Sequence, residues 1–567
     1  MRQQYEPSAD RIIALYQQLE DDILSAVIRR ILKMGYVSEA SKHQLEVLQA
    51  AGLLYDDIVQ LIADRTDACT AQVKALFEDA GVQTVEIDNS LHEAAGALPI
   101  DIRQDSSTRQ VLEAGYKKTL GTMQNLVSTT ATQTQTAFIQ TCDRIYMQVS
   151  SGAFSYQEAI MNALRALADT GATVSYPTGH TNRMDVAVRL CVLTGVSQTA
   201  AAVSLQQAED AGCYLMEITA HSGARHDHAK WQGQLVTITG KDAGKIIDGL
   251  RVFTLSEIGY GSGEGFKGWN CHHNWHAYYP GFSTPNYTPE ELKRLDEPCI
   301  SYNGKLYTEY EVSQMQRAQE RRVRAWKRRC ITAQEGVNSA TDEATRATAQ
   351  AEYSKSAVHL KANEEKLKDF CKQTGQNRDR FREQVYGFGR SEAQRAVQAN
   401  NSSFRNTMRQ KGIKNPPKSL AELEKMKYNN PKEYDLMQSY SKSVDSGMMS
   451  PLVGYEKYKE YHKRVEKELI GLTTSNGITI KSQSKHFLER VFGTISDPSH
   501  DGVMRTGVEL EDVKEALLYG KVEKVKIKKK SNGELGKSQR FCTDKCFVSV
   551  NPDECILIQA NPRNSRK

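Results

Sequence analysis

The sequence predicts a multidomain, mainly α-helical protein with smaller α+β parts. Its 567 residues exceed the length of one ordinary domain. Up to about residue 210, apolar side chains recur at steps of three and four, as in amphipathic helices. In residues 213–300 and again after 471, short apolar runs between turn residues indicate strands. We therefore expect a helical N-terminal region, a small mixed domain, a long charged helix and a C-terminal α+β domain.

Composition excludes several other classes of protein. With 38 glycines, 14 prolines and 25% charged residues, the chain is neither collagen-like nor fully disordered. Its 11 cysteines are scattered irregularly, unlike a disulfide framework, so we expect reduced thiols in a cytosolic setting. The sequence has no apolar run of about 18 residues, and its N-terminal segment is too acidic for a signal peptide. We therefore expect no membrane partner and no export.

The net charge of +5 combines two unlike parts. Residues 1–220 contain 16 Lys and Arg against 26 Asp and Glu, which is a net charge of −10, whereas residues 221–567 carry +15. Basic surfaces attract phosphate and acidic surfaces repel it. We therefore expect the first part to dock on protein and the second to lie near nucleic acid.

An N-terminal helical domain is predicted over residues 1–104. Residues 8–34 carry a regular apolar stripe and form its first helix. Residues 38–62 repeat the pattern, but Gly52 interrupts it, so two helices joined by a turn are predicted there.

The next two segments differ sharply in composition. Residues 105–212 are rich in Ala, Thr, Gln and Leu, and Gly152, Gly171 and Pro177 divide them into three or four helices of a bundle or arm. Residues 213–300 contain short apolar runs, many glycines and six of the thirteen histidines. They predict a small mixed domain with functional loops.

A long basic helical segment is predicted over residues 301–412. It is preceded by a short helix that Thr288 caps, and it begins with a hairpin at 299–307. One long charged helix should then run from about 309 to 374. Its arginine cluster at 317–329 is interpreted either as a solvated helix face or as a contact with nucleic acid or an acidic partner.

The C-terminal part begins with a linker and short helices at residues 413–470, marked by Asn415-Pro416-Pro417. Residues 471–567 predict a compact α+β domain. Two short helices, at 484–491 and 509–519, precede about four strands joined by turns that contain Asn, Gly and Pro.

Two histidine-rich runs in the mixed domain, 221–233 and 268–276, contain residue types that can carry chemistry. Cys sulfur and His nitrogen are ligands that zinc prefers, and a Cys beside a His can be an activated nucleophile. The spacing fits no standard zinc template, and no oxyanion hole or orienting carboxylate can be assigned. The sequence therefore favours a hydrogen-bonded structural cluster with no metal and no cofactor. The residues that a metal would use are His221, His226, His228, Cys271 and His276.

A second cluster lies in the last domain. His486 and Arg490 are four residues apart and share one face of a helix. A His can take or give a proton and an Arg can hold a phosphate, which suits RNA cleavage. The alternative is a half-buried His486 beside a solvated lysine strand. The other candidates are Arg540 and Gln559 for catalysis, and Lys485, Lys526, Lys528 and Lys529 for nucleic-acid binding.

Motifs in a fixed order cover about the first 400 residues. They include His221-Ser-Gly-Ala-Arg225, the glycine-rich run 258–265 and Gly268-Trp-Asn-Cys271-His-His, with outer matches at 12–20, 181–189 and 316–324. This combination resembles the phage minor capsid protein 2 family, which is related to the MuF-type head-morphogenesis proteins of tailed phages. The resemblance implies a MuF-like domain at 213–300 and a virion component present in few copies. It further implies a place in the capsid interior, portal and capsid proteins as partners, and assembly in the host cytoplasm.

The last domain has a resemblance of its own. Residues 482–490, 507–520, 542–552 and 557–562 resemble phage-encoded barnase, EndoU, colicin and RelE-like nucleases, which occur at the ends of MuF-type capsid proteins. The resemblance implies a metal-independent ribonuclease with His486 as its helical histidine. Many such nucleases have Ser or Thr on the final strand, where this chain has Gln559 and Ala560.

The resulting hypothesis is a minor capsid protein that carries a C-terminal ribonuclease effector. Its nucleic-acid partner is packaged DNA or a target RNA, and no small-molecule substrate is expected. Two alternatives stay open. One is a standalone prophage-encoded toxin-type ribonuclease whose N-terminal region serves only packaging and delivery. The other is a non-catalytic nucleic-acid-binding capsid component.

Overall fold

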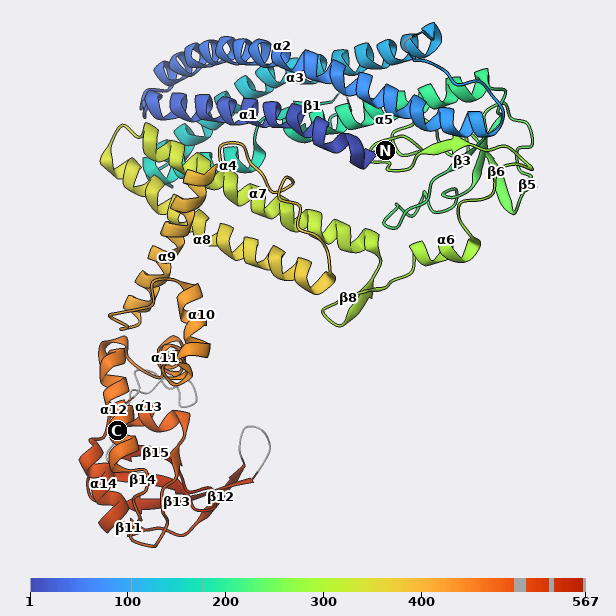
Figure 1. Cartoon of the computed structure of the whole chain (residues 1–567). Coiled ribbons are helices and arrows are strands. Elements are labelled where there is room, and N and C mark those ends of the chain that lie inside the picture. Colours follow the sequence, from blue (N-terminus) through green and yellow to red (C-terminus); the bar gives the residue numbers. More distant parts are fainter. Residues whose placement is uncertain (1, 103, 177, 494–505, 530–534, 564–567) are drawn as a thin grey trace. The chain divides into compact units, whose positions relative to one another are not determined.

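The computed structural model describes residues 2–102, 104–176, 178–493, 506–529 and 535–563 (Figure 1). The chain divides into two compact units, Met1–Val397 and Gln398–Lys567. Each unit has a hydrophobic core of its own. Helices predominate in both and the sheets are small, which confirms a multidomain, mainly α-helical protein.

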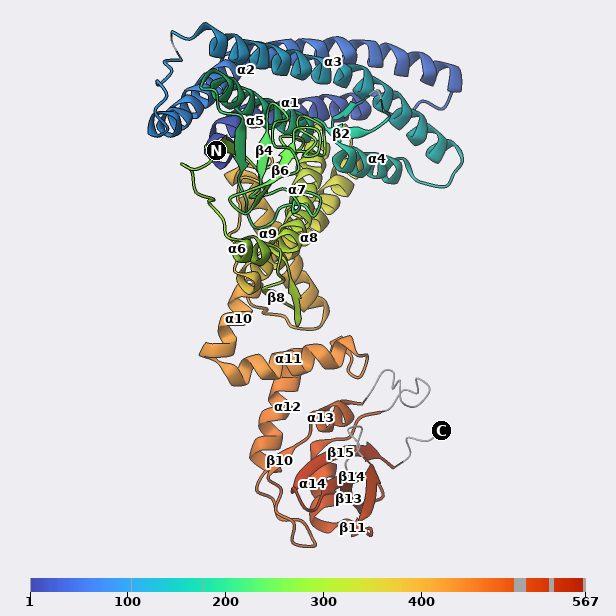
Figure 2. The same ribbon diagram turned by 90° about the vertical axis from the view of Figure 1, so that its right-hand side faces the viewer.

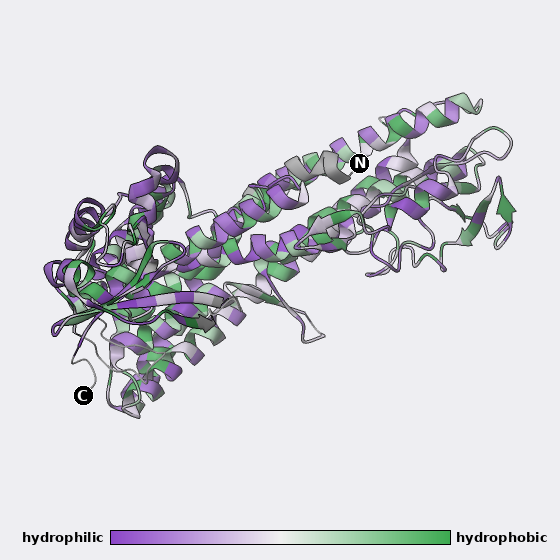
Figure 3. Ribbon diagram, turned by 90° about the horizontal axis from the view of Figure 1, so that it is seen from below, coloured by the Kyte–Doolittle hydropathy of each residue, from purple (hydrophilic) through white to green (hydrophobic). Residues whose placement is uncertain are grey.

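The first unit is built on five helices. They are α1 (Arg2–Met34), α2 (Ala40–Ala94), α3 (Ser106–Ser150), α4 (Tyr156–Thr170) and α5 (Met184–Asp210). The helices α1, α2, α3 and α5 pack against one another along their lengths (Figures 1 and 2). Green and purple residues alternate along the helices in Figure 3, as expected of amphipathic helices. The two-stranded sheet between α4 and α5 consists of β1 (Thr173–Ser175) and β2 (Thr181–Arg183).

The structure corrects the prediction for α2. This helix continues through Gly52, so the predicted turn between two helices is wrong. A glycine inside a helix costs about 1 kcal/mol relative to alanine. Here Ala51, Leu54 and Ile58 on either side of Gly52 are buried in the core, and their burial outweighs that cost.

Helix α5 is the central helix of the first unit. By length and composition alone it is apolar enough to cross a membrane. In this fold, however, it packs against α1, α2 and α3, and 56% of its most apolar window is buried. Packing in the core therefore accounts for its apolar character.

The predicted long charged helix is wrong, because residues 309–374 form a hairpin of two helices. Helix α7 (Glu309–Ser339) ends where Ala340 takes an extended backbone conformation. Asp342 then caps α8 (Glu343–Thr374) by accepting a hydrogen bond from the Thr345 amide at 2.8 Å. The two helices lie side by side (Figure 1), and this packing buries an apolar face that a single extended helix would expose.

The arginine cluster of α7 is partly internal. Arg324 and Arg328 each lie 3.5 Å from the Asp185 carboxylate on α5, and Arg328 also lies 3.9 Å from Glu20 on α1. Burial raises the pKa of Glu20 and lowers that of Arg328, although each group has an oppositely charged neighbour. These two arginines therefore hold helices together, which neither interpretation of the cluster anticipated. Others in the cluster are exposed, among them Arg321 and Arg322.

The mixed part of the first unit contains a five-stranded sheet with strand order β5-β6-β4-β3-β7. Strands β4 and β6 pair in parallel and the other pairs are antiparallel. The strands are β3 (Leu215–Ile218), β4 (Leu235–Thr237), β5 (Ile246–Ile247), β6 (Leu250–Thr254) and β7 (Trp275–Ala277). A buried cluster with Trp231, Phe266 and Trp275 packs beside it.

The predicted short helix and hairpin follow this sheet. Helix α6 (Pro289–Leu295) begins with a capping box in which Thr288 and Glu291 bond each other's backbone amides. The hairpin consists of β8 (Ile300–Tyr302) and β9 (Lys305–Tyr307). Both predictions are confirmed.

The second unit combines helices with one sheet. Its helices are α9 (Arg390–Gln410), which starts before the division, α10 (Leu420–Asn429), α11 (Pro431–Asp445), α12 (Tyr455–Glu468), α13 (Lys485–Phe492) and α14 (Leu510–Tyr519), with a 3-10 turn at Pro451–Val453. Its sheet has strand order β10-β15-β14-β13-β11, and β12 also pairs with β13. The strands are β10 (Ser482–Gln483), β11 (Lys521–Val522), β12 (Lys526–Lys529), β13 (Leu535–Cys542), β14 (Cys546–Asn551) and β15 (Ile556–Pro562). The predicted pair of helices followed by antiparallel strands is confirmed, but β10, which precedes both helices and pairs in parallel with β15, was not predicted.

Candidate functional site

One face of the C-terminal sheet is polar. Arg540 on β13 pairs with Ser549 on β14, and Ser549 pairs with Gln559 on β15. Side chains of residues directly opposite each other point to the same face of a sheet, so these three form a row across it. The neighbouring row faces the core and contains Phe541, Val548 and Ala560.

Ser549 is the central residue of the polar row. It is buried, and its hydroxyl has no hydrogen-bond partner among the described residues. An unpaired buried hydroxyl is costly and therefore rare, and a functional role or a bound partner is one explanation for it. Arg540 places its guanidinium 4.5 Å from the centre of the Phe547 ring, which holds the cation over this face.

His486, on the first turn of α13, is bonded to a buried carboxylate. Its Nδ1 lies 2.6 Å from Glu489 Oε2, and Glu489 Oε1 accepts a hydrogen bond from the Ser443 hydroxyl of α11 at 2.5 Å. The His486 side chain is 71% exposed, whereas that of Glu489 is 8% exposed. A carboxylate bonded to Nδ1 orients the imidazole and leaves Nε2 free for proton transfer in solvent. Neither Glu489 nor Ser443 was predicted as a site residue from the sequence.

The start of α13 is attached to the strand that carries Gln559. The Ser484 amide donates to the Leu557 carbonyl at 2.7 Å, and its hydroxyl donates to the Ile558 carbonyl at 2.7 Å. Across the described residues, no hydrogen bond or ion pair links the His486 side chain to Arg540 or Gln559. The predicted catalytic residues thus form two groups, one on α13 with half-buried Arg490 and one on the sheet.

The predicted lysine contacts are only partly described. Lys526 on β12 is half exposed and lies 3.5 Å from the Glu523 carboxylate. The side chains of Lys485, Lys528 and Lys529 lie outside the described residues.

The histidine-rich runs of the first unit meet in a buried cluster. His228, Cys271 and His273 each offer one ligand atom, and these three atoms lie within 4.8 Å of one another. Cys271 Sγ is 3.6 Å from His273 Nδ1, and both residues come from the loop that leads into β7. His228 comes from the other run. His273 was not among the predicted ligands, although its imidazole lies in the same motif.

The two imidazoles have polar partners on their far sides. His273 Nε2 lies 3.2 Å from Gln232 Oε1, and His228 Nε2 lies 2.8 Å from the Glu264 carbonyl oxygen, which also accepts from Arg225. Burial, followed by the neighbouring imidazoles, lowers the pKa of His273 to about 2, and burial also lowers the pKa of His228. Both rings are therefore neutral at ordinary pH and can offer a lone pair.

Three of the predicted cluster residues lie outside this group. His221 packs against it, with its ring centre 4.4 Å from that of His273. His226 is exposed. His276 on β7 belongs to another network, in which its Nε2 is 3.3 Å from the buried Glu217 carboxylate and 2.8 Å from Asn286 Nδ2.

The glycine-rich run 258–268 brings backbone segments together beside the cluster. A side chain at Gly265 would overlap the backbone of Gly259, and one at Gly268 would overlap the backbone at Ser262 and Gly263. Only glycine fits such close approaches. The run therefore holds the loop that presents Cys271.

Comparison with known proteins identifies the first unit. The phage minor capsid protein 2 family matches residues 2–372. The chain belongs to this family. A "Structural protein" of Lactococcus phage LL-H is 24% identical over 333 residues, which is 57% of this chain and 86% of the relative. A "Structural protein" of Lactococcus phage mv4 is 37% identical over 81 residues, which is 14% of this chain and 57% of the relative. No solved structure matches the chain.

Family membership makes the chain a phage minor capsid structural protein and confirms that part of the sequence-based hypothesis. The buried cluster of His228, Cys271 and His273 lies inside the region that the family match covers. The candidate ribonuclease site at His486 lies beyond that match, which ends at residue 372.

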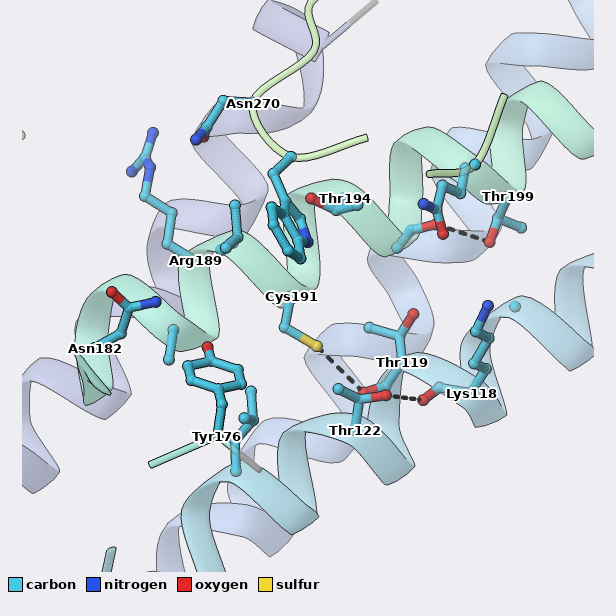
Figure 4. A pocket seen from close by; sticks show the side chains of 18 of the residues that line it. Lys118, Thr119, Thr122, Tyr176, Asn182, Arg189, Cys191, Thr194, Thr199 and Asn270 are labelled. Carbon is cyan, nitrogen blue, oxygen red and sulfur yellow. Dashed lines mark hydrogen bonds between the residues drawn. The ribbon is translucent and has the colours of Figure 1, made fainter. Parts of the chain in front are cut away.

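The minor capsid protein also contains a pocket of about 1320 Å³ in its family-matched region (Figure 4). Its walls come mainly from α3 and α5, including Thr119, Cys191 and Thr194, and Trp269 and Asn270 of the loop before Cys271 also line it. None of the predicted site residues lines this pocket. Some lining residues, among them Asn182, Trp269 and Asn270, belong to motifs of the family resemblance, but the pocket itself arises from how two distant helices pack.

Proposed function

We propose that this chain is a virion component that assembles with other phage structural proteins, at the portal and in the head interior, and that its C-terminal part is a ribonuclease. The family match over residues 2–372 supports the structural role. Mass spectrometry of purified virions and of portal complexes tests it. The chain should be present in both, and its absence from particles at every stage of assembly would contradict the proposal.

The ribonuclease proposal rests on the imidazole of His486, which the buried Glu489 orients through Nδ1. In the proposed reaction, His486 Nε2 takes the proton from a ribose 2′-hydroxyl. The 2′ oxygen then attacks the adjacent phosphorus, the bond to the 5′ oxygen breaks, and that oxygen takes a proton from solvent. The products are a 2′,3′-cyclic phosphate and a 5′-hydroxyl, and no metal is required.

The polar row on the sheet supplies groups that suit the phosphate. The Arg540 guanidinium can pair with phosphate oxygens, and the Ser549 hydroxyl and Gln559 amide can donate to them as negative charge develops. The unpaired hydroxyl of Ser549 on β14 provides a polar group next to Gln559 on the final strand.

The test compares the wild-type chain with His486→Ala on single-stranded RNA in the presence of EDTA. We expect His486→Ala to slow cleavage by about 100-fold or more. The matched control is His462→Ala, a half-buried histidine on α12 of the same unit, which should cleave at the wild-type rate. If neither the wild type nor His486→Ala cleaves RNA, the enzymatic proposal is rejected and a non-catalytic nucleic-acid-binding component remains.

A further inference from the structure

We propose that His228, Cys271 and His273 form a structural zinc site inside the first unit, with His221 as the fourth ligand. The site joins the two histidine-rich runs, which lie about forty residues apart in sequence. It is independent of the ribonuclease proposal, because all four residues lie in the family-matched region.

The spacing of two ligand atoms fits a zinc site. Zinc binds thiolate sulfur at about 2.3 Å and imidazole nitrogen at about 2.0–2.1 Å in a tetrahedron, which places sulfur and nitrogen about 3.6 Å apart. The distance between Cys271 Sγ and His273 Nδ1 is 3.6 Å. The ligand atom of His228 lies within 4.8 Å of both, so a small movement of that ring completes three corners.

The outer hydrogen bonds are those of zinc ligands. A histidine that binds metal through one ring nitrogen usually donates its other N–H to a carbonyl or carboxylate, which fixes the tautomer and the ring orientation. His273 Nε2 lies 3.2 Å from the Gln232 side-chain oxygen, and His228 Nε2 lies 2.8 Å from both the Glu264 carbonyl oxygen and Arg225 Nη2. In each case Nδ1 is the atom left for the metal.

His221 has the features of the fourth ligand. Its Nδ1 lies 2.9 Å from the Ser222 carbonyl oxygen, which fixes the proton on Nδ1. Its Nε2 is buried and has no hydrogen-bond partner among the described residues. The centre of the His221 ring is 4.4 Å from that of His273, which places this ring beside the other three residues.

The surroundings indicate a structural rather than a hydrolytic site. His228, Cys271 and His273 are all buried, and Trp231 packs on both imidazoles at 4.4 and 4.7 Å between ring centres. Catalytic zinc sites keep a position open for water, whereas structural sites are closed by four protein ligands. Zinc here would fix the loop before β7, which also carries Trp269 of the α3–α5 pocket.

The test uses the full-length chain, purified without a histidine tag. Metal analysis should find about one zinc per chain. After zinc removal, Co²⁺ should produce a thiolate-to-cobalt charge-transfer band and the visible bands of tetrahedral cobalt. Cys271→Ser should lose the charge-transfer band. Gln232→Leu keeps all ligands and should weaken metal binding about 10- to 100-fold.

Two matched variants control for general effects of losing a thiol or an imidazole. Cys299→Ser and His226→Ala change exposed residues of the same types and should bind cobalt as the wild type does. Wild-type protein that holds no stoichiometric zinc and shows no thiolate-to-cobalt band would overturn the proposal, whether or not Cys271→Ser folds. The contact between Cys271 and His273 would then be a simple S–H···N hydrogen bond. A band that persists in folded Cys271→Ser would also overturn it.

Discussion

The buried carboxylate of Glu489 distinguishes His486 from an ordinary surface histidine. It binds His486 on one side and the Ser443 hydroxyl on the other, so neither group can turn freely. Glu489→Gln keeps the size of the side chain but removes the charge that stabilises the imidazolium. We expect RNA cleavage to slow roughly 10- to 100-fold, less than the loss of His486 itself.

Initial rates of RNA cleavage, together with urea unfolding of the same protein, measure this prediction. The control is Glu466→Gln, which removes the equivalent partner of His462 on α12 and should cleave RNA at the wild-type rate. A folded Glu489→Gln variant that cleaves RNA at the wild-type rate would contradict the orienting role of Glu489.

Asp21 on α1 makes stability depend on pH in the first unit. Burial raises its pKa to about 7, although the Gly387 amide donates to its carboxylate at 2.7 Å and Arg328 lies near. An unfolded Asp releases its proton near pH 4. Between about pH 4 and 7, unfolding therefore releases a proton from Asp21, and its contribution to stability falls as the pH rises.

Asp21→Asn tests this dependence, because the amide oxygen can still accept from Gly387. At pH 8 the variant should be more stable than the wild type by about 1–2 kcal/mol. Partial exposure of Asp21 screens its charge, so the difference is smaller than the full pKa shift would give. Below about pH 4 the two should be equally stable. Urea unfolding between about pH 4 and 8 measures this difference in stability, and Asp22→Asn, at the neighbouring position, is the control. A constant difference at all pH values would contradict the assignment to Asp21.

Helix α2 can be stabilised at the glycine that misled the sequence prediction. Gly52 lies in the interior of the helix, and a methyl group there would meet no atom within 4 Å. Gly52→Ala should therefore raise the free energy of unfolding of the first unit by about 0.5–1 kcal/mol. Gly195→Ala in α5 is the contrasting variant, because its methyl group would overlap Thr119 of α3 and should destabilise the unit. Thermal unfolding of the two variants distinguishes a propensity effect from a packing effect.

Periodicity predicted most helices because it reports which residues face a core. It predicted α1, α13 and α14, and breaker residues predicted three or four helices between 105 and 212, where the structure has α3, α4 and α5. It failed at Gly52 and at Asp342, where local chemistry and packing compete. In α2, Gly52 suggested that a helix ends, but packing in the core keeps the helix continuous. Between α7 and α8, Asp342 caps a new helix, but the continuous charged pattern of the two helices suggested a single one.

The candidate sites were predictable only in part, since their partners are distant in sequence. His228 and Cys271 were recognised from their motifs, and His486 from its helix and its family resemblance. Glu489 was missed because its importance depends on Ser443, 46 residues away. Ser549 was missed because only the register of β13, β14 and β15 places it between Arg540 and Gln559.

At the scale of the whole molecule, charge is not a simple guide to partners. The basic excess after residue 220 includes Arg324 and Arg328, whose charges pair with Asp185 in the acidic first part. Some of the positive charge counted after residue 220 is therefore paired inside the first unit and does not attract nucleic acid. The lysines around β12 belong to the second unit, so the proposed nucleic-acid binding should depend on that unit.

The limits of the second unit lead to a prediction about truncation. The core that supports the C-terminal sheet also contains side chains that precede residue 471, among them Met437, Tyr440, Tyr455 and Tyr458. Losing one large buried side chain costs about 3–5 kcal/mol, and a typical domain is stable by only about 5–15 kcal/mol. A fragment of residues 398–567 should therefore unfold cooperatively, whereas one of residues 471–567 should be largely unfolded. Circular dichroism during urea unfolding measures both, and a cooperative 471–567 fragment would show that the sheet and its two helices form an independent domain.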